Sequence, residues 1–553
     1  MLALKRIYLY AVLGIALAVM LVGLTDVARV ALDRVGDILA ARTYVSDDTR
    51  TELSWALALV IVSAPVLLVH LALVRRSLRG PAVTVADERA SASRATYFFI
   101  VLAATGVLAG MRLVDLGESL IGIVAYGHRA WGLGSSAAGA LVIGSAWLVH
   151  VWARGKDLRL APARTAGDWL VRGYLYGALL VTALLACVGA GNVLTVVARR
   201  LLDLRPAWES VIWWEDELAW AIALTLVTSA AWVLHWLISR RLLGAQPPMG
   251  EAHRDSRTRS GYFVTVVLVA AATTLVLISM GLSSVFAELA GTWQPTDGSR
   301  LIEDVGGPLL LVVPFVAVWW WHLRRAASEA LAFGGVERAI LMVRSGRLAV
   351  AFVGLAGLAV GSAWELQALL DAVGTAGRET LFSSTEVVDA STSALAAALV
   401  GLVMWAPAWL LSQRDRSRDV VAAATAGARR GYLFLVSGLA VVALMVALAF
   451  VVYQAARLLL GIELVDDSSW ALAVLIVSVM VLAYHLWCLR ADLLVAQALE
   501  TPTTEAEEDS RVIETIEISA PAGADFKVLN AAIRTELPDG FELRVVPRGQ
   551  LEV

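Results

Sequence analysis

The sequence predicts an all-helical polytopic membrane protein of twelve transmembrane helices, arranged as six parallel two-helix repeats and followed by a small α+β (βαβ) module. The first reason is composition: of the 553 residues, 59% are hydrophobic and 17% are charged, whereas soluble domains have about 45–50% apolar and about 25% charged residues. The second reason is that the apolar residues form runs of about 20, the length that crosses a hydrocarbon core of about 30 Å. The third is a short motif that opens such a run six times.

In this motif a basic residue is followed two or three positions later by a tyrosine. The six tyrosine-equivalent positions lie 77 to 89 residues apart, which indicates that one unit has been repeated in tandem. The fifth repeat has Arg347 where the others have tyrosine. The residues that keep the motif are Arg6 and Tyr8, Arg94 and Tyr97, Arg172 and Tyr174, Arg259 and Tyr262, and Arg430 and Tyr432.

Each repeat contains two apolar stretches, and stretches of this length without alternation form helices rather than barrel strands. The repeats are expected at 1–80, 90–156, 168–243, 256–326, 340–414 and 426–492. Their spans are expected near 8–25 and 55–73, 97–116 and 133–152, 173–197 and 218–238, 262–286 and 305–323, 347–370 and 389–411, and 432–456 and 470–489. The first run follows Lys5 and Arg6 as a signal peptide would, but its motif also opens internal runs, so we expect a retained helix.

The connectors between repeats carry five basic residues each, whereas most loops within repeats lean acidic, as at Glu215, Asp216 and Glu217. The first within-repeat loop is an exception, because it also holds four arginines. Short loops rich in lysine and arginine stay on the cytoplasmic side. The pattern therefore predicts that every connector and both termini face the cytoplasm.

The C-terminal tail differs in composition from the rest. Residues 500–510 form an acidic linker, and residues 511–553 have the pattern of a strand, a helix with the apolar face Phe526, Leu529, Ile533 and Leu537, and a second strand. About 40 residues bury little core alone. We therefore expect this module to dock on a protein partner or to associate with another copy.

Five of the seven histidines recur at one position, the cytoplasmic end of the second span: His70, His150, His235, His322 and His485. Trp409 replaces histidine in the fifth repeat. An interfacial aromatic belt is one interpretation. Haem ligation by paired imidazoles, or proton transfer, is the other. The motif residues are likewise interpreted as interface anchors for anionic headgroups, or as a specific lipid site.

A third row lies eighteen residues past the motif tyrosine. It contains Asp26, Asp115, Asn192 and Glu365, with Met280 and Phe450 in the remaining repeats. Eighteen residues of helix span about 27 Å, which places this row near the outer interface. Arginines three residues away predict structural ion pairs for two of these carboxylates, and an ion or solute path is the alternative.

The sequence lacks the signatures of several classes of function. The net charge of −3 gives no footprint for nucleic acid. Cys187 and Cys488 both lie in apolar runs, so no disulfide framework and no metal site is expected. Neither a phosphate-binding glycine-rich loop nor a catalytic constellation is recognised. We expect a non-enzymatic protein with no cofactor.

The motif, the amphipathic tract after the first span and the arginine-terminated second span together resemble a bacterial membrane family known as the domain of unknown function 5671 family. The resemblance covers residues 1–490 in copies. It implies a multi-pass protein of the bacterial inner membrane in contact with the lipid bilayer, and it implies no activity. A scaffold or assembly protein is the first functional hypothesis. A transporter or channel using Asp26, Asp115, Asn192 and Glu365 is the second, and a haem-binding redox protein is the third.

Overall fold

The helical part of the chain is defined by a computed structural model. It describes residues 2–39, 47–127, 132–160, 168–202, 204, 213–246, 249–254, 256–292, 301–374, 385–460 and 469–500. The chain divides into two compact units, Met1–Ala496 and Gln497–Val553. The acidic linker and the βαβ module predicted for the tail lie outside the described residues, apart from the linker's first residue. No strand occurs in the ranges given above.

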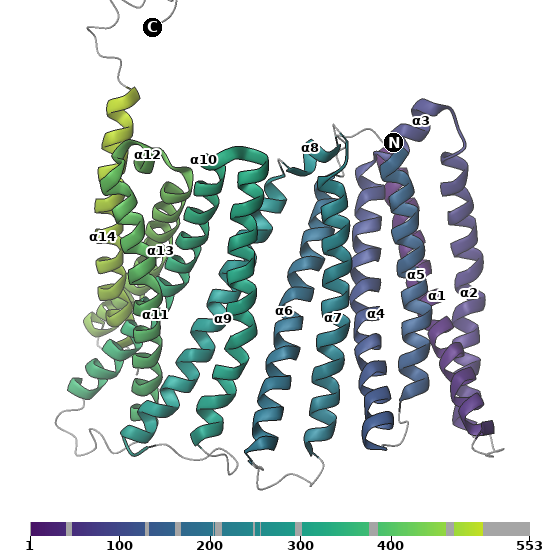
Figure 1. The fold of residues 1–553 in the computed structure, drawn as a ribbon, viewed down its shortest axis with the longest axis horizontal. Coiled ribbons are helices and arrows are strands. Elements are labelled where there is room, and N and C mark those ends of the chain that lie inside the picture. The colour runs from purple at the N-terminus through teal and green to yellow at the C-terminus, as the bar shows by residue number, and fades with distance from the viewer. Residues whose placement is uncertain are drawn as a thin grey trace, which may run out of the picture. The chain divides into compact units, whose positions relative to one another are not determined.

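The first unit is built from long helices that run side by side (Figure 1). Eleven helices in the described part of the chain are long and apolar enough to cross a membrane. The helices are α1 (Leu2–Leu39), α2 (Asp47–Ser77), α3 (Ala82–Arg89), α4 (Ala92–Tyr126), α5 (Leu133–Leu160), α6 (Asp168–Leu201), α7 (Trp213–Leu243), α8 (Met249–Arg254), α9 (Arg257–Leu289), α10 (Leu301–Gly374), α11 (Thr385–Arg418), α12 (Val420–Thr425), α13 (Gly427–Leu459) and α14 (Ser469–Glu500).

One of the eleven, α10, is a hairpin of two helices. It has 74 residues, and its backbone leaves the helical conformation at Gly335, where φ is 75°. Residues 323 and 346 would be about 35 Å apart along a straight helix, yet a Cβ added to Gly346 would overlap the side chain of Leu323. The chain therefore turns back near Gly335, and the predicted spans 305–323 and 347–370 lie in separate legs, 301–334 and 336–374.

The helices of the first five repeats pack as pairs, and each pair packs on its neighbours. Contacts join α1 to α2, α4 to α5, α6 to α7, α9 to α10, and α10 to α11. Between repeats, α1 contacts α4 and α5, α4 contacts α6 and α7, α6 contacts α9 and α10, and α10 contacts α13. The helices α13 and α14 touch through long side chains, as between Phe450 and Trp470, whose ring centroids are 5.0 Å apart.

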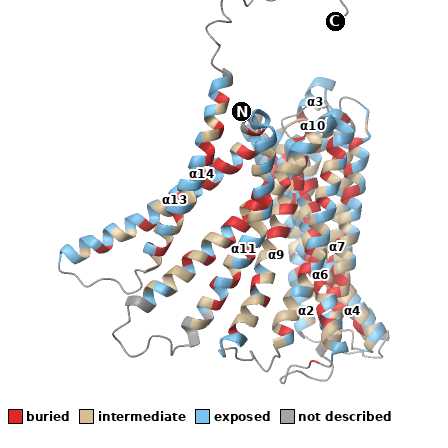
Figure 2. Ribbon diagram, turned by 60° about the vertical axis from the view of Figure 1, so that its left-hand side comes forward, coloured by how far each residue is buried: buried red, intermediate tan, exposed pale blue. Residues whose placement is uncertain are grey.

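Buried residues lie mainly where helices face one another (Figure 2). Many large apolar side chains are exposed. The largest core cluster gathers residues of α9, α10, α11, α13 and α14 around Trp409 and Leu433. The exposed set includes Val124 and Leu459, which are 84% and 87% exposed. A lipid environment accepts such side chains at no cost, because acyl chains are as apolar as leucine.

Small residues let α10 and α11 approach closely. A Cβ added to Gly354 would lie 2.5 Å from the backbone nitrogen of Trp405, and one added to Gly361 would overlap the backbone at Ala398. At both glycines the added Cβ would lie closer to the α11 backbone than real Cβ atoms come to other atoms. The two backbones therefore touch without intervening side chains.

The Gly354→Ala substitution should therefore lower stability, because the α11 backbone would have to move. We expect a loss of about 1–3 kcal/mol, the usual cost of overpacking, measured as a lower midpoint of thermal unfolding in mild detergent. Gly438→Ala in α13 is the matched control, since a Cβ there meets nothing within 4 Å. Equal effects of the two substitutions would show that the close approach is not needed.

Candidate functional site

Polar side chains gather at the arginine-rich end of the helices, defined as the end at which one repeat is joined to the next. Three of the buried arginines there lie three residues before a motif tyrosine: Arg94, Arg259 and Arg429 are 6%, 5% and 3% exposed. Each pairs with a carboxylate from the second helix of its own repeat, namely Asp157, Glu329 and Asp492. We call these three groups the buried ion-pair clusters.

The ion pairs are hydrogen-bonded at short range. Arg94 Nε donates to Asp157 Oδ2 at 2.6 Å, Arg259 Nε to Glu329 Oε2 at 3.0 Å, and Arg429 Nε to Asp492 Oδ2 at 2.7 Å. A buried charge is tolerated only when it is paired and its remaining hydrogen-bonding groups are satisfied. These pairs therefore fix how the two helices of repeats two, four and six lie against each other.

The same arginines also reach the preceding repeat. Arg94 Nη1 donates to the hydroxyl of Tyr10, and Arg259 Nη1 to the hydroxyl of Tyr176, both at 3.0 Å. Arg429 Nη1 instead donates to Ser412 Oγ at 2.9 Å. Tyr10 and Tyr176 both lie two residues after a motif tyrosine, in repeats one and three. The clusters thus join repeats in pairs: one with two, three with four, and five with six.

Next to the clusters, motif tyrosines bind the recurring histidines of their own repeats. The distances from hydroxyl oxygen to Nε2 are 2.9, 3.2, 2.8 and 3.4 Å for Tyr97–His150, Tyr174–His235, Tyr262–His322 and Tyr432–His485. In each histidine Nδ1 lies 2.7–2.8 Å from the carbonyl oxygen four residues earlier. A carbonyl oxygen can only accept, so Nδ1 carries the proton and, in the neutral ring, Nε2 accepts from the tyrosine.

The first and fifth repeats depart from this arrangement. Tyr8 is 62% exposed, and its ring centroid lies 5.9 Å from that of His70. Trp409 stacks on Tyr432 with centroids 5.1 Å apart and donates to the Tyr484 hydroxyl at 2.6 Å. Where the tyrosine would stand, Arg347 instead pairs with Asp415 at 3.3 Å.

Most residues suggested as headgroup anchors thus interact with other side chains of the protein. Arg6 pairs with Glu88 at 2.7 Å. Arg172 is half-buried. In the sixth repeat the buried cluster uses Arg429, whereas the sequence pattern pointed to the neighbouring Arg430, which is half-buried.

The carboxylates of the clusters were not singled out from the sequence, although a signal exists. Asp157, Glu329 and Asp492 each lie seven residues after a recurring histidine, in the second, fourth and sixth repeats only. Seven residues make about two helical turns, so the acid lies on the face of the histidine. This spacing shows that the acid is present in the even repeats and absent from the odd ones.

The four polar residues near the opposite end lie on four different helices, each with a local partner. Asp26 lies 4.0 Å from Arg29, and Asp115 lies 3.4 Å from Arg112. Asn192 donates to the carbonyl oxygen of Val188 at 2.8 Å. Glu365 accepts from Ser391 through both oxygens. Within the described ranges no hydrogen bond or ion pair connects any two of the four.

The described residues contain no group of three or more histidine, cysteine, aspartate or glutamate side chains that could hold a metal ion. Cys187 and Cys488 are buried and not joined in a disulfide. Both ring nitrogens of four recurring histidines already interact with protein atoms. A metal or haem iron would have to displace a tyrosine to bind any of these four.

Long apolar helices joined by tandem connectors define a multi-pass helical membrane protein. The family described as "Domain of unknown function (DUF5671)" matches residues 6–125, 197–309 and 344–480, about two thirds of the chain. The chain belongs to this family, and the three matched regions agree with its internal repeats. Comparison with curated proteins and with solved structures finds no match.

Two arginines of α4, each in an ion pair, provide a matched test of the clusters. Arg94→Gln removes the nearer cation from the buried carboxylate of Asp157, with Arg89 remaining at 3.7 Å, and we expect a loss of about 3–5 kcal/mol in the free energy of unfolding. Arg112→Gln removes a pair whose side chains are 44% and 46% exposed, and should cost at most about 1 kcal/mol. Thermal unfolding in detergent compares the two variants, and equal shifts would contradict a structural role for the buried pair.

Proposed function

We propose that this protein is a non-enzymatic scaffold of the bacterial inner membrane, with twelve crossings and a cytoplasmic tail that recruits a partner. The observation that carries the proposal is that the side chains of the buried ion-pair clusters and most recurring histidines interact with other side chains of the protein. Arginines pair with carboxylates, tyrosines with histidines, and the hydroxyls that complete each cluster come from the preceding repeat. Such groups hold helices together and offer no reactive group to a substrate.

The proposed twelve crossings count the two legs of α10 separately. Each leg contains an apolar stretch of the length required to cross a bilayer. With two crossings in every repeat, all connectors between repeats lie on one side. The arginine content of these connectors favours the cytoplasm for that side.

A transport path would require polar groups that converge on one route through the protein. Asp26, Asp115, Asn192 and Glu365 have separate local partners, which favours structural roles. A haem site would require imidazole nitrogens that are open to iron, whereas most recurring histidines have both nitrogens engaged. These two observations support the scaffold over its alternatives.

The test is purification of the tagged full-length chain in mild detergent, with identification of co-purifying proteins and an absorbance spectrum of the same sample. We expect a reproducible partner and no Soret band. Leu529→Asp, on the predicted apolar face of the tail helix, should release the partner because a charge there would disrupt docking. Lys527→Asp, off that face, is the control and should retain it.

The scaffold proposal would be contradicted by either of two results. One is a stoichiometric Soret band that disappears in His322→Ala. The other is solute uptake by reconstituted vesicles that is abolished by Glu365→Gln while the variant remains folded.

A further inference from the structure

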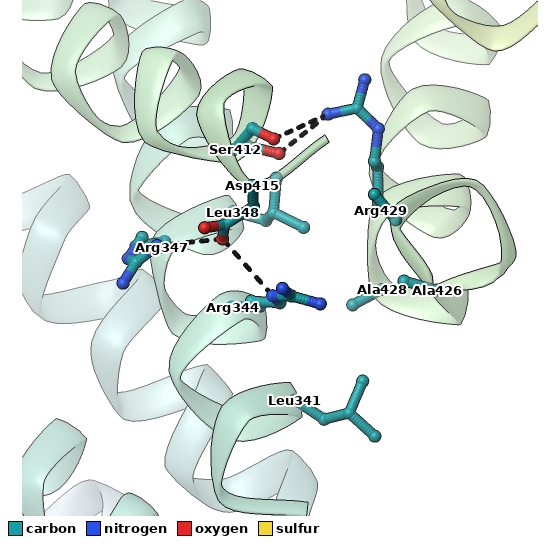
Figure 3. A pocket seen from close by; sticks show the side chains of 10 residues that line it. Leu341, Arg344, Arg347, Leu348, Ser412, Asp415, Ala426, Ala428 and Arg429 are labelled. Carbon is teal, nitrogen blue, oxygen red and sulfur yellow. Dashed lines mark hydrogen bonds and ion pairs between the residues drawn. The ribbon is translucent and has the colours of Figure 1, made fainter. Parts of the chain in front are cut away.

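A hollow opens at the arginine-rich end of the fifth repeat, between the second leg of α10, α11, α12 and the start of α13 (Figure 3). It occupies about 390 Å³, including the part that is open to the surface, and about 20 Å³ of it admits atoms the size of water. Its polar lining consists of Arg344, Arg347, Ser412, Asp415 and Arg429. The remaining lining is leucine and alanine.

The charges in this hollow are not balanced. Arg344 Nε and Arg347 Nη1 both lie 3.3 Å from the same oxygen, Oδ2 of Asp415, and Figure 3 shows both side chains turned toward it. One carboxylate between two guanidinium groups leaves one positive charge. Arg429 also lines the hollow, but the carboxylate that neutralises it, Asp492, lies on α14 and is not part of the lining.

The group is also more open than its counterparts. The side chains of Arg344, Arg347 and Asp415 are 28%, 35% and 25% exposed, whereas those of Asp157 and Asp492 are 5% and 0% exposed. In the other repeats a tyrosine stands at the position of Arg347. The arginine adds a positive charge to the fifth repeat. It also takes the place of the tyrosine whose hydroxyl binds the recurring histidine in repeats two, three, four and six.

The position in the helices sets the depth of the hollow in the bilayer. The apolar stretch of the second α10 leg begins at Arg347, that of α11 ends near residue 411, and that of α13 begins at Tyr432. The polar lining residues therefore lie at the boundary of the hydrocarbon region, where phosphate groups of lipids lie. A basic pocket between helices on this side is the chemistry that binds an anionic headgroup.

We propose that this hollow binds a phosphate group, carried by an anionic lipid headgroup or by a soluble phosphate. The guanidinium groups of Arg344 and Arg347 match phosphate oxygens in geometry and charge, and Ser412 lies on the same wall. The inner space has room for about one atom the size of water, so a phosphate oxygen would reach it while the rest of the headgroup and the acyl chains remained outside. The site does not depend on the scaffold proposal, because a transporter could carry it equally well.

The test compares binding of phosphatidylglycerol, phosphatidylcholine and inorganic phosphate to the full-length protein in detergent, by native mass spectrometry for the lipids and calorimetry for phosphate. Arg344→Gln combined with Arg347→Gln should weaken phosphatidylglycerol binding about 25-fold, roughly fivefold for each charge. The matched control is Arg75→Gln combined with Arg76→Gln, two exposed arginines in the first repeat, which should bind as the wild type does.

Asp415→Asn keeps the test decisive if the double variant does not fold. Removing the carboxylate releases both arginines, so the anion should bind about fivefold more tightly. Binding of phosphatidylglycerol alone identifies a lipid as the source of the phosphate, and binding of inorganic phosphate with the same dependence on the variants identifies a soluble one. The proposal is overturned if the double variant binds both anions as its control does, or if Asp415→Asn shows no gain.

Discussion

The buried ion pairs at the arginine-rich end are the constraint on which the rest of the structure depends. A charge removed from water must find its counter-charge within the protein. Here the arginine comes from the first helix of an even repeat, and the carboxylate from its second helix. The hydroxyl comes from the preceding repeat. A single interaction such as Arg259 with Glu329 and Tyr176 thus fixes three helices in depth and in rotation.

The tyrosine–histidine pairs extend this constraint within most repeats, and the alternation of the clusters makes two repeats the structural unit. The first repeat of a unit provides a hydroxyl, and the second provides the charges. The third unit differs, because Arg347 and Trp409 replace the tyrosine and the histidine of the fifth repeat. There Arg429 and Asp492 keep their buried ion pair, and a second, partly exposed group of Arg344, Arg347 and Asp415 lines the hollow proposed to bind phosphate.

The apolar runs and the repeat motif predicted the helical class, the spans and their order, because apolar length alone determines whether a helix can cross a bilayer. Hairpin formation by α10 was implicit in this prediction, although the break at Gly335 was not foreseen. The site was predicted only in part. Arg94 and Arg259 were identified, but Asp157 and Glu329 lie 63 and 70 residues further along the chain.

The spacing of residues in the sequence indicates which of them share a face of one helix. It does not indicate which neighbouring helix that face packs against. That is also why Arg430 was chosen over Arg429. Adjacent residues in a helix are rotated by about 100°, so only one of them can point into the cluster, and the packing of α13 on α14 decides which.

The most direct test asks whether all connectors between repeats lie on one side of the membrane. Single cysteines would replace Val83, Val336 and Val420 in the connectors, and Val124, Leu289 and Leu459 at the opposite helix ends, all of them exposed positions, with Cys187 and Cys488 changed to alanine. A membrane-impermeant maleimide should label the second set in intact cells, and the first set only after permeabilisation. Labelling of any connector cysteine in intact cells would contradict the arrangement of tandem hairpins.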